Sequence, residues 1–272
     1  MAKIKPFFSI IIPTLNEEKY LPLLLDDLSH QTFRDFEVIV VDGHSSDQTV
    51  FQTKTFISKL PSLKIINSPK RHVCVQRNLG ASHARADILI FSDADNRLPS
   101  YFLQGIKYRW ESSAVDVLSL HIRPDVITPQ NETIANALNL FFDLQKPTKP
   151  RYLLESLIII SKSAFNSIGG FNASINYAEG KSFIQNITNL GYSSKIIKDP
   201  QYTFSFRRLR KFGIMNMANR VAKLELAELL GSEFNTYQTK RLYPMVGGTI
   251  FNKPKRVKNK FLKNITQLLK DF

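Results

Sequence analysis

Four short apolar runs alternate with segments of helical periodicity in the N-terminal third of the chain, and this alternation constrains the fold more than any other feature. The runs cover residues 7–12, 36–41, 63–66 and 87–91. Apolar, β-branched runs of this length are typical of strands that are buried on both faces of a sheet. Because strands separated by helices form βαβ units, the sequence predicts an α/β fold with a mainly parallel sheet flanked by helices.

Polar residues stand where the helices between these strands are expected to begin. Asn16 is in position to cap the first helix, with Glu17 in its first turn, where the helix dipole favours an acidic side chain. Ser46 or Asp47 is expected to cap the second helix. A third helix over residues 73–84 completes the predicted alternation.

The composition is that of a globular protein, since 43% of the 272 residues are hydrophobic and 22% are charged. These values exclude a disordered or fibrous chain, and a chain of this length can bury a sizeable core. Its one cysteine, Cys74, excludes a disulfide framework and a zinc site built from several cysteines. No apolar run of about 18 residues occurs, so we expect no membrane-spanning helix.

The net charge of +14 is concentrated in the last quarter of the chain. Residues 195–272 carry 17 Lys and Arg against 5 Asp and Glu, or +12, whereas residues 1–194 carry 20 against 18, or +2. We therefore predict a nearly neutral body over residues 1–200 and a basic, mostly helical extension over residues 201–272. Such an extension commonly meets phosphate, in nucleic acid, anionic lipid or a phosphorylated substrate.

Polar side chains collect directly after three of the predicted strands. In parallel α/β sheets, ligands bind beyond the carboxyl ends of the strands, so these side chains are expected to line one binding site. They are Thr14, Asn16 and Glu17 after the first strand, Asp42 and Ser45 after the second, and Asp93 and Asp95 after the fourth.

The tripeptide Asp93-Ala94-Asp95 is the sharpest local signal for a metal ion. Two carboxylates at this spacing can offer oxygen atoms to one divalent cation, Mg²⁺ or Mn²⁺, which keeps other positions open for the oxygens of a diphosphate. An Asp-x-Asp sequence is also common in solvated turns. The apolar run that precedes it forces this pair to the end of a buried strand, which favours the metal site.

Four motifs occur in order along residues 7–98. They are SIIIPTLNE over 9–17, QTF and FEVIVVDGHSSDQT within 31–49, QRNLG over 76–80, and SDAD over 92–95. In these motifs and their order the chain resembles glycosyltransferase family 2, the inverting nucleotide-sugar glycosyltransferases with the GT-A fold. A thinner similarity continues over residues 158–172, which resemble the acceptor-side segment of that family.

The resemblance implies a GT-A domain over residues 1–200, with a nucleotide-sugar-binding half over 1–98 and an acceptor half over 99–200. The basic extension over 201–272 lies outside the resemblance. The donor would be a nucleoside-diphosphate sugar, a UDP-sugar or a GDP-sugar, bound with Mn²⁺ or Mg²⁺. The acceptor would be a hydroxyl group, for example on a lipid-linked or polysaccharide-precursor glycan.

The resemblance also implies roles for individual residues of the donor site. Asp42 would hydrogen-bond the nucleoside, and Ser45 lies in the same motif. Arg77 would reach the nucleotide, because its planar fork suits phosphate or a carbonyl edge. Asp93 would face the ribose or the metal ion, and Asp95 would bind the metal ion. The base and ribose site would be lined by Pro13, Thr14, Asn16 and Glu17.

Inverting transfer needs a carboxylate that takes the proton of the attacking hydroxyl. The family usually supplies it from a Glu-Asp pair at the start of a helix, with the aspartate as base. The matching residues here are Glu179 and Gly180, so Glu179 is the candidate base. Two alternatives stay open: another acid, such as Asp143 or Glu155, serves as base, or the enzyme is impaired.

The basic extension has three interpretations. Aromatic and basic residues interleave over 204–212, a helical pattern covers 217–230, and residues 253–263 are strongly basic. Cationic helices with aromatic anchors bind anionic membrane surfaces, so we expect a cytoplasmic protein that attaches peripherally to the inner face of the cytoplasmic membrane. A solvated basic face covering the core is the second interpretation, and nucleic-acid binding is the least favoured.

Two other function classes compete with a glycosyltransferase. A nucleotidyltransferase normally carries a Gly-rich loop with a basic residue after its first strand, and residues 13–18 lack one. A non-catalytic protein that binds nucleotide or anionic lipid would account for the basic extension and leave the carboxylates after the fourth strand without a role.

Overall fold

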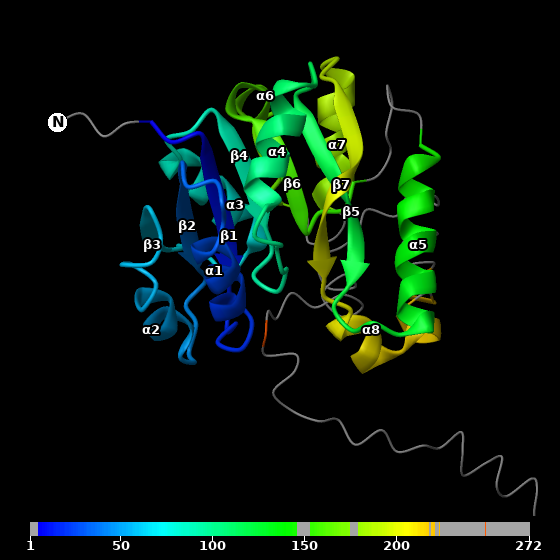
Figure 1. Cartoon of the computed structure of the whole chain (residues 1–272), viewed down its shortest axis with the longest axis horizontal. Coiled ribbons are helices and arrows are strands. Elements are labelled where there is room, and N and C mark those ends of the chain that lie inside the picture. The colour runs from blue at the N-terminus through cyan, green and yellow to red at the C-terminus, as the bar shows by residue number, and fades with distance from the viewer. Residues whose placement is uncertain are drawn as a thin grey trace, which may run out of the picture.

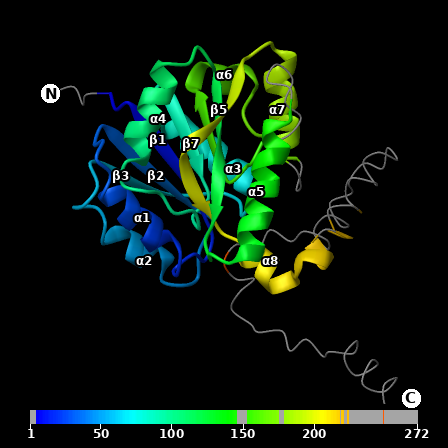
Figure 2. The ribbon, with the colours of Figure 1, turned by 45° about the vertical axis from the view of Figure 1, so that its right-hand side comes forward.

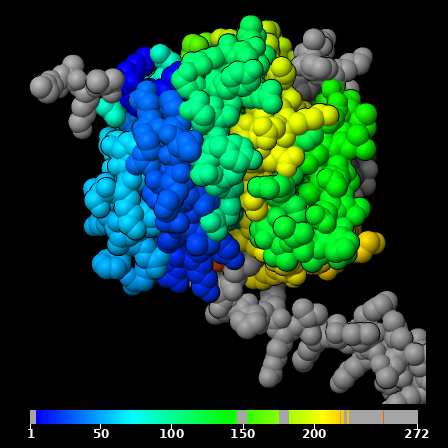
Figure 3. Space-filling view, in the orientation of Figure 1, coloured from blue at the N-terminus to red at the C-terminus, as the bar shows by residue number. Residues whose placement is uncertain are grey.

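The computed structural model describes residues 5–145, 153–174, 179–217, 219, 220, 223 and 248, with the side chains at 179–181 left out. The described residues form a seven-stranded sheet with helices on both faces, in the order β3-β2-β1-β4-β6-β5-β7 (Figure 1). In a space-filling view the N-terminal and C-terminal parts of the described chain lie side by side in one body (Figure 3).

The N-terminal half contains the four predicted strands and the predicted helices between them. All strand pairings in this half are parallel, as the sequence predicts, with β1 between β2 and β4. The elements are β1 (Phe8–Thr14), α1 (Leu21–Ser29), β2 (Phe36–Asp42), α2 (Thr49–Lys54), β3 (Leu63–Asn67), α3 (Val73–His83) and β4 (Ile88–Ser92).

The C-terminal half completes the sheet with three further strands. Strand β6 is antiparallel to both β4 and β5, whereas β7 is parallel to β5, so the sheet is mixed. Strand β7 continues past the predicted domain boundary at residue 200. The elements are α4 (Phe102–Glu111), β5 (Val117–Pro124), α5 (Pro129–Asp143), β6 (Leu157–Ser161), α6 (Lys162–Ser167), α7 (Glu179–Asn189), β7 (Ser194–Phe204) and α8 (Arg207–Phe212).

Asn16 does not cap α1, which is a correction to the sequence-based expectation. Helix α1 begins at Leu21, with Tyr20 at the N-cap position, while Asn16 has a left-handed φ of +54°. The side chain of Asn16 instead accepts a hydrogen bond from the backbone N–H of Ser46 at 2.7 Å. The physical reason is that asparagine tolerates the left-handed region, which lets the chain turn sharply at the end of β1 before the helix starts.

The second predicted cap is shifted by one residue. Helix α2 begins at Thr49, and the N-cap position is Gln48 rather than Ser46 or Asp47. The carboxylate of Asp47 nevertheless accepts the backbone N–H of Thr49 at 3.0 Å, so an acidic side chain still satisfies a donor at this helix start.

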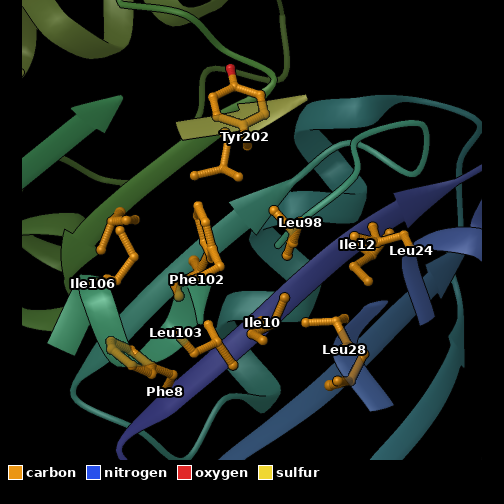
Figure 4. Packing of buried hydrophobic residues seen from close by; sticks show 14 of the residues in the cluster. Phe8, Ile10, Ile12, Leu24, Leu28, Leu98, Phe102, Leu103, Ile106 and Tyr202 are labelled. Atoms are coloured by element: carbon orange, nitrogen blue, oxygen red, sulfur yellow. The ribbon is translucent and has the colours of Figure 1, made fainter. Parts of the chain in front are cut away.

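The core consists of two apolar layers, one on each face of the sheet. Alternate residues of β1 point to opposite faces, so Ile10 and Ile12 join the layer under α1 and α4, while Ile11 joins the layer under α3, α6 and α7. Figure 4 shows the first layer, in which Phe102 of α4 packs near Tyr202 of β7. Burial on both faces explains why these strands are apolar throughout.

Helix α5 and helix α8 flank the C-terminal half. Two views related by a 45° turn show α5 beside β5 and α8 at the carboxyl ends of β5 and β7 (Figures 1 and 2). No helix within the described part of the chain is long and apolar enough to cross a membrane.

The packing of α3 on the sheet generates a stability prediction. A Cβ atom added at Gly80 would lie 2.3 Å from Cγ2 of Ile11 and 3.1 Å from Cγ2 of Val41, and both of these side chains are fully buried. The gain in helix propensity for Gly80→Ala, about 1 kcal/mol, is smaller than the cost of overpacking. We expect the free energy of unfolding to fall by about 1–2 kcal/mol in urea denaturation.

A matched control lies two residues along the same helix. Ser82 is exposed, so Ser82→Ala should leave the free energy of unfolding nearly unchanged. Equal stabilities of Gly80→Ala and Ser82→Ala would contradict the close approach of α3 to β1.

Candidate functional site

The carboxyl ends of β1, β2 and β4 meet at one rim of the sheet, as predicted. Thr14 and Asp42 are register partners at the ends of β1 and β2. The backbone N–H of Gly43 donates to the carbonyl oxygen of Thr14 at 2.8 Å, so the two chains stay together beyond the last ladder pair. Strand β4, on the other side of β1, delivers Asp93 and Asp95 to the same rim.

Hydrogen bonds between backbone and side chains hold the loops after β1 and β2 together. The backbone N–H of Asn16 donates to Oγ of Ser45 at 2.8 Å. The next backbone N–H, of Glu17, donates to Oγ1 of Thr49 at 2.8 Å. The predicted donor residues Asn16, Glu17 and Ser45 therefore form one connected surface rather than two separate loops.

Two non-glycine residues of these loops have left-handed backbones. They are Asn16, with φ of +54°, and His44, with φ of +63°. Such conformations cost about 1–3 kcal/mol each and persist only where the surroundings hold them, which is a common property of ligand-binding loops.

Asp42 has a buried oxygen atom that needs a hydrogen-bond donor. Its Oδ2 accepts the backbone N–H of Ser45 at 2.9 Å. Its Oδ1 is buried and finds no hydrogen-bond partner among the described residues. A buried carboxylate oxygen without a donor is costly, so this atom is suited to a donor group on a ligand, such as a base or ribose N–H or O–H.

Pro13 and Thr14 are buried at the end of β1, and their side chains offer no polar group at the rim. Pro13 is buried within β1 opposite Val41, and the Thr14 hydroxyl donates to the carbonyl oxygen of Ile12 at 3.3 Å. Gln76, which the sequence analysis left without a role, donates from Nε2 to the carbonyl oxygens of Thr14 at 2.8 Å and Val41 at 2.7 Å. Its amide thus fixes the relative position of the two strand ends.

Arg77 holds Asp93 from below the rim. Its Nη2 donates to Oδ1 of Asp93 at 2.9 Å and to the carbonyl oxygen of Glu155 at 3.0 Å. The guanidinium carbon lies 5.0 Å from the ring centroid of Phe171. Removal of water raises the pKa of Asp93, the Arg77 charge opposes this, and Asp95 raises the pKa further. The arginine that the resemblance assigns to the nucleotide thus also orients a candidate metal ligand.

Residues of the C-terminal half support the turn that carries Asp93. The carbonyl oxygen of Ser156 accepts the backbone N–H of Asp93 at 2.8 Å and Nδ2 of Asn96 at 2.6 Å. Its hydroxyl shares a 2.7 Å hydrogen bond with the hydroxyl of Tyr202. Figure 4 shows the Tyr202 ring above the apolar core with its hydroxyl turned away from it. Burial raises the pKa of Tyr202, so this hydroxyl stays protonated.

Arg207 enters the site from the start of α8, and the sequence analysis missed it. Its Nη1 and Nη2 donate to the two carboxylate oxygens of Glu17 at 2.7 Å each. Its Nε lies 2.7 Å from Oδ2 of Asp95. Its guanidinium carbon lies 4.6 Å from the ring centroid of Tyr20. One side chain thus joins the loop after β1 to the turn after β4.

The signal that could have found Arg207 is the basic and aromatic run over residues 204–212, placed directly after the last strand. The sequence analysis assigned this run to the basic extension, where its cations were expected to face a membrane or solvent. In the structure Arg207 faces inward, and Arg210 pairs with both oxygens of Asp125 at 2.7 and 2.6 Å. A β strand followed by a turn can direct one cation of a basic run into a site and leave its neighbours outside.

The Glu17–Arg207 pair is buried, with 5% and 10% of the two side chains exposed. Burial raises the pKa of Glu17, and Asp95 and Asp93 raise it further, while Arg207 opposes the rise. Burial acts to lower the pKa of Arg207, but the hydrogen bonds to Glu17 and the charge of Asp95 raise it overall. Each charge here depends on the others, because little water is present to screen it.

Gly248, the one residue described after residue 223, contacts the same loop. The backbone N–H of Gly248 donates to the carbonyl oxygen of Leu15 at 3.0 Å. A Cβ atom at Gly248 would lie 1.9 Å from the carbonyl oxygen of Asn16, so only glycine allows this approach. The C-terminal quarter therefore reaches the rim at both Arg207 and Gly248.

The carboxylates at the rim have the chemistry that a divalent cation needs. Asp93 and Asp95 offer oxygen atoms, which Mg²⁺ and Mn²⁺ prefer as ligands. Glu17 lies close enough that the charges of both aspartates raise its pKa. The described residues contain no preformed group of three or more His, Cys, Asp or Glu side chains around one metal position. The donor set fits a cation that takes its remaining ligands from a diphosphate and water.

A family model described as Glycosyl transferase family 2 matches residues 9–169, which is more than half of the chain. The chain belongs to this family. A PGL/p-HBAD biosynthesis glycosyltransferase of Mycobacterium tuberculosis is 30% identical over 174 residues, 61% of this chain and 64% of that protein. The chain therefore spans less than two thirds of the length of this relative.

Two solved structures of glycosyltransferases share the fold of this family 2 chain. S. aureus TarS in complex with UDP-GlcNAc has a TM-score of 0.62 and 22% identity, covering 86% of this chain and 70% of TarS. The mannosyltransferase PcManGT from Pyrobaculum calidifontis, in complex with GDP-Man and Mn²⁺, has a TM-score of 0.62 and 20% identity, covering 90% and 70%. The predicted GT-A fold is confirmed.

The candidate base of this family 2 chain stands at the expected helix start. Glu179 is the first residue of α7 and Gly180 is the second, and the side chain of Glu179 lies outside the described residues. The alternative acid Asp143 is engaged elsewhere, since it pairs with Nε2 of His121 at 2.8 Å and Nζ of Lys198 at 3.3 Å. Glu155 lies beside Arg77, whose Nη2 donates to its carbonyl oxygen.

Proposed function

We propose that this protein is an inverting glycosyltransferase that uses Mn²⁺ or Mg²⁺ to transfer a sugar from a nucleoside-diphosphate sugar to an acceptor hydroxyl. One observation carries the proposal. In a family 2 chain, the buried Oδ1 of Asp42 without a donor and the carboxylates of Asp93 and Asp95 meet at one rim of the sheet. The first suits a nucleoside, and the other two suit a metal-bound diphosphate.

The structural neighbours support the class of donor. TarS was solved with UDP-GlcNAc, and PcManGT was solved with GDP-Man and Mn²⁺. We therefore expect a UDP-sugar or a GDP-sugar here. The connected loops after β1 and β2 would hold the base and ribose through Asn16, Glu17, Asp42 and Ser45. The diphosphate would lie toward the turn after β4.

The residues of the rim would have different roles in the transfer. When bound, the cation neutralises charge on the departing diphosphate. Asp93 and Asp95 would hold it, and Arg77 fixes the orientation of Asp93 through a 2.9 Å hydrogen bond. Tyr202 and Ser156 keep the turn in place from the acceptor half. This arrangement orients charged groups before the donor arrives, which is the main source of electrostatic stabilisation in enzymes.

Glu179 is proposed as the general base. It begins α7, where the family places its acidic pair, and the competing acid Asp143 is a poor base. Although partial burial opposes it, hydrogen bonds from His121 and Lys198 lower the pKa of Asp143 and hence its ability to take a proton.

The relatives support a hydroxyl on a lipid-linked or polysaccharide-precursor glycan as acceptor. One relative is described by its part in PGL/p-HBAD biosynthesis, and TarS is described as a poly(ribitol-phosphate) β-N-acetylglucosaminyltransferase. A lipid-linked acceptor would explain the charge of the C-terminal extension, which would then attach the enzyme peripherally to the inner face of the cytoplasmic membrane. Residues 253–263, the most basic segment, lie outside the described residues.

The first test is donor binding by Asp95→Asn. Without this carboxylate charge the metal ion loses a ligand, so we expect the Mn²⁺-dependent affinity for UDP or GDP to fall about tenfold or more in calorimetry. The melting temperature of the apo protein should change by only about 2–4 °C, because Arg207 keeps its pair with Glu17.

Asp87→Asn is the matched control, because Asp87 lies just before β4, at the opposite end of that strand, and is exposed. Its metal-dependent affinity should equal that of the wild type. If Asp95→Asn binds nucleotide as well as the wild type does in Mn²⁺, the metal assignment is wrong. Release of nucleoside diphosphate from a UDP- or GDP-sugar supports glycosyl transfer, whereas release of pyrophosphate would indicate a nucleotidyltransferase.

The second test is Glu179→Gln, which keeps the shape of the side chain but cannot accept a proton. The turnover rate should fall by roughly 10²–10⁴-fold. Donor affinity should persist, because the base faces the acceptor. The matched control is Asp143→Asn, which should keep most of the turnover. Unchanged turnover in Glu179→Gln would place the base elsewhere.

The third test concerns the membrane. The nine Lys and Arg residues from Lys240 to Lys270 would contribute about 1 kcal/mol each if they lie near an anionic surface. Full-length protein should co-sediment with anionic vesicles and not with zwitterionic ones. Binding should disappear on truncation after Tyr237 and at 1 M salt, where the Debye length is about 3 Å. Absence of binding at low salt would refute attachment by the extension.

A further inference from the structure

Arg207 places a positive charge where the proposed function needs a metal ion. The guanidinium pairs with both oxygens of Glu17 at 2.7 Å, and its Nε lies 2.7 Å from Oδ2 of Asp95. Asp95 is the carboxylate proposed to bind the cation. The other candidate ligand, Asp93, is already paired with Arg77. A cation and Arg207 would therefore be drawn to the same carboxylate.

The two positive charges cannot both lie against Asp95 without strong repulsion. Only 10% of the Arg207 side chain and 14% of the Asp95 side chain are exposed, so water and salt screen this repulsion poorly. The three carboxylates Glu17, Asp93 and Asp95 carry a formal charge of about −3, and Arg77 and Arg207 contribute about +2. In this state the two arginines already neutralise two of these three charges, which would otherwise attract a free divalent ion.

We infer that Arg207 is a built-in counter-ion, which a divalent cation displaces from Asp95 only when a nucleoside diphosphate arrives with it. The inference rests on the proposed function and concerns how the same site is loaded. The diphosphate oxygens give the displaced guanidinium a new anionic partner, for which its planar fork is well suited. Arg207 thereby makes the binding of metal depend on the binding of nucleotide.

The attachment of α8 is compatible with such a displacement. Helix α8 has six residues, none of them fully buried, and its C-cap residue is Gly213, whose φ is +77°. Its second ion pair, between Arg210 and Asp125, is more exposed, with 41% of the Arg210 side chain accessible. Leu209 of this helix packs partly buried against the core, and the Arg207 and Arg210 ion pairs add to its attachment. Charged side chains can exchange partners more readily than a buried apolar face can.

The displacement would also leave Glu17 able to take part in donor binding. Its backbone N–H donates to Oγ1 of Thr49 at 2.8 Å, so the backbone of Glu17 stays at the rim when Arg207 moves. The neighbouring charges of Asp93 and Asp95 raise the pKa of Glu17 beyond the effect of burial. A metal ion would reduce the repulsion between these carboxylates. A bound cation would thereby replace the charge neutralisation that Arg207 provides in its absence.

The test compares Mn²⁺ affinity in the absence of nucleotide. Full-length wild type, Arg207→Gln and Arg210→Gln are titrated with Mn²⁺, and free Mn²⁺ is measured by electron paramagnetic resonance. Removing the competing cation should strengthen Mn²⁺ binding by Arg207→Gln about tenfold. Arg210→Gln is the matched control, because it removes a bidentate arginine–carboxylate pair from the same helix outside the site. It should bind Mn²⁺ as the wild type does, and Arg207→Lys, which keeps the charge, should also stay close to the wild type.

A second measurement uses the coupling between metal and nucleotide. Saturating UDP or GDP should strengthen Mn²⁺ binding by the wild type, and by linkage Mn²⁺ must strengthen nucleotide binding by the same factor. This factor should be smaller in Arg207→Gln, because the metal site of this variant can bind Mn²⁺ without nucleotide. Equal or weaker Mn²⁺ affinity of Arg207→Gln without nucleotide, relative to the wild type, would overturn the inference.

Two further outcomes separate this inference from the proposed function. If the wild type binds neither Mn²⁺ nor UDP or GDP, both fail. If the wild type binds both ligands but Arg207→Gln behaves like Arg210→Gln, only the counter-ion role fails.

If Arg207→Gln does not fold, a measurement on the wild type tests the inference. The Nε–H resonance of Arg207 should shift with Mg²⁺ and UDP or GDP together and not with Mg²⁺ alone. An unmoved resonance would overturn the inference.

Discussion

Strand β1 is hydrogen-bonded to β2 on one side and to β4 on the other, and all three strands run in the same direction. Their carboxyl ends therefore lie side by side, and whatever follows each strand is delivered to the same rim. The loop after β1 brings Asn16 and Glu17, β2 itself ends at Asp42, and the turn after β4 carries Asp93 and Asp95. The chemistry of the site depends on this parallel pairing, which the apolar layers on both faces of the sheet stabilise.

Several charged side chains lie at the rim although most of them are shielded from water. The carboxylates and arginines among them form ion pairs. Arg77 comes from α3 and holds Asp93, while Arg207 comes from α8 and joins Glu17 to Asp95. Buried pairs of this kind contribute little net stability, because desolvation offsets much of the attraction. Their value lies in orientation: both arginines fix carboxylates in a polar, partly dry site before any ligand is present. The same pairing makes α8 part of the site.

Sequence reasoning located most of the rim because each of its residues follows a strand that is visible as an apolar run. It missed Arg207, since no local pattern distinguishes an arginine that turns inward from one that faces solvent. It also placed Asn16 as a helix cap, because an asparagine before two acids and a leucine stripe fits that pattern. The structure uses the tolerance of asparagine for a positive φ instead, and the helix begins at Leu21. Ser156 and Tyr202, which support the turn after β4, carry no motif and are brought there only by β7 and the segment before β6.

The sequence by itself determined the four parallel strands, the helices between them, the family and the positions of the carboxylates, because hydrophobic periodicity and motif spacing act over short stretches of chain. Only the tertiary structure decided which distant groups neutralise those carboxylates. Glu17 and Arg207 are 190 residues apart in sequence, yet their side chains form a bidentate pair at 2.7 Å. Their meeting depends on the path of β7 along the edge of the sheet and on the turn that follows it. Electrostatic pairing acts through space, so its partners become known only when the whole sheet is assembled.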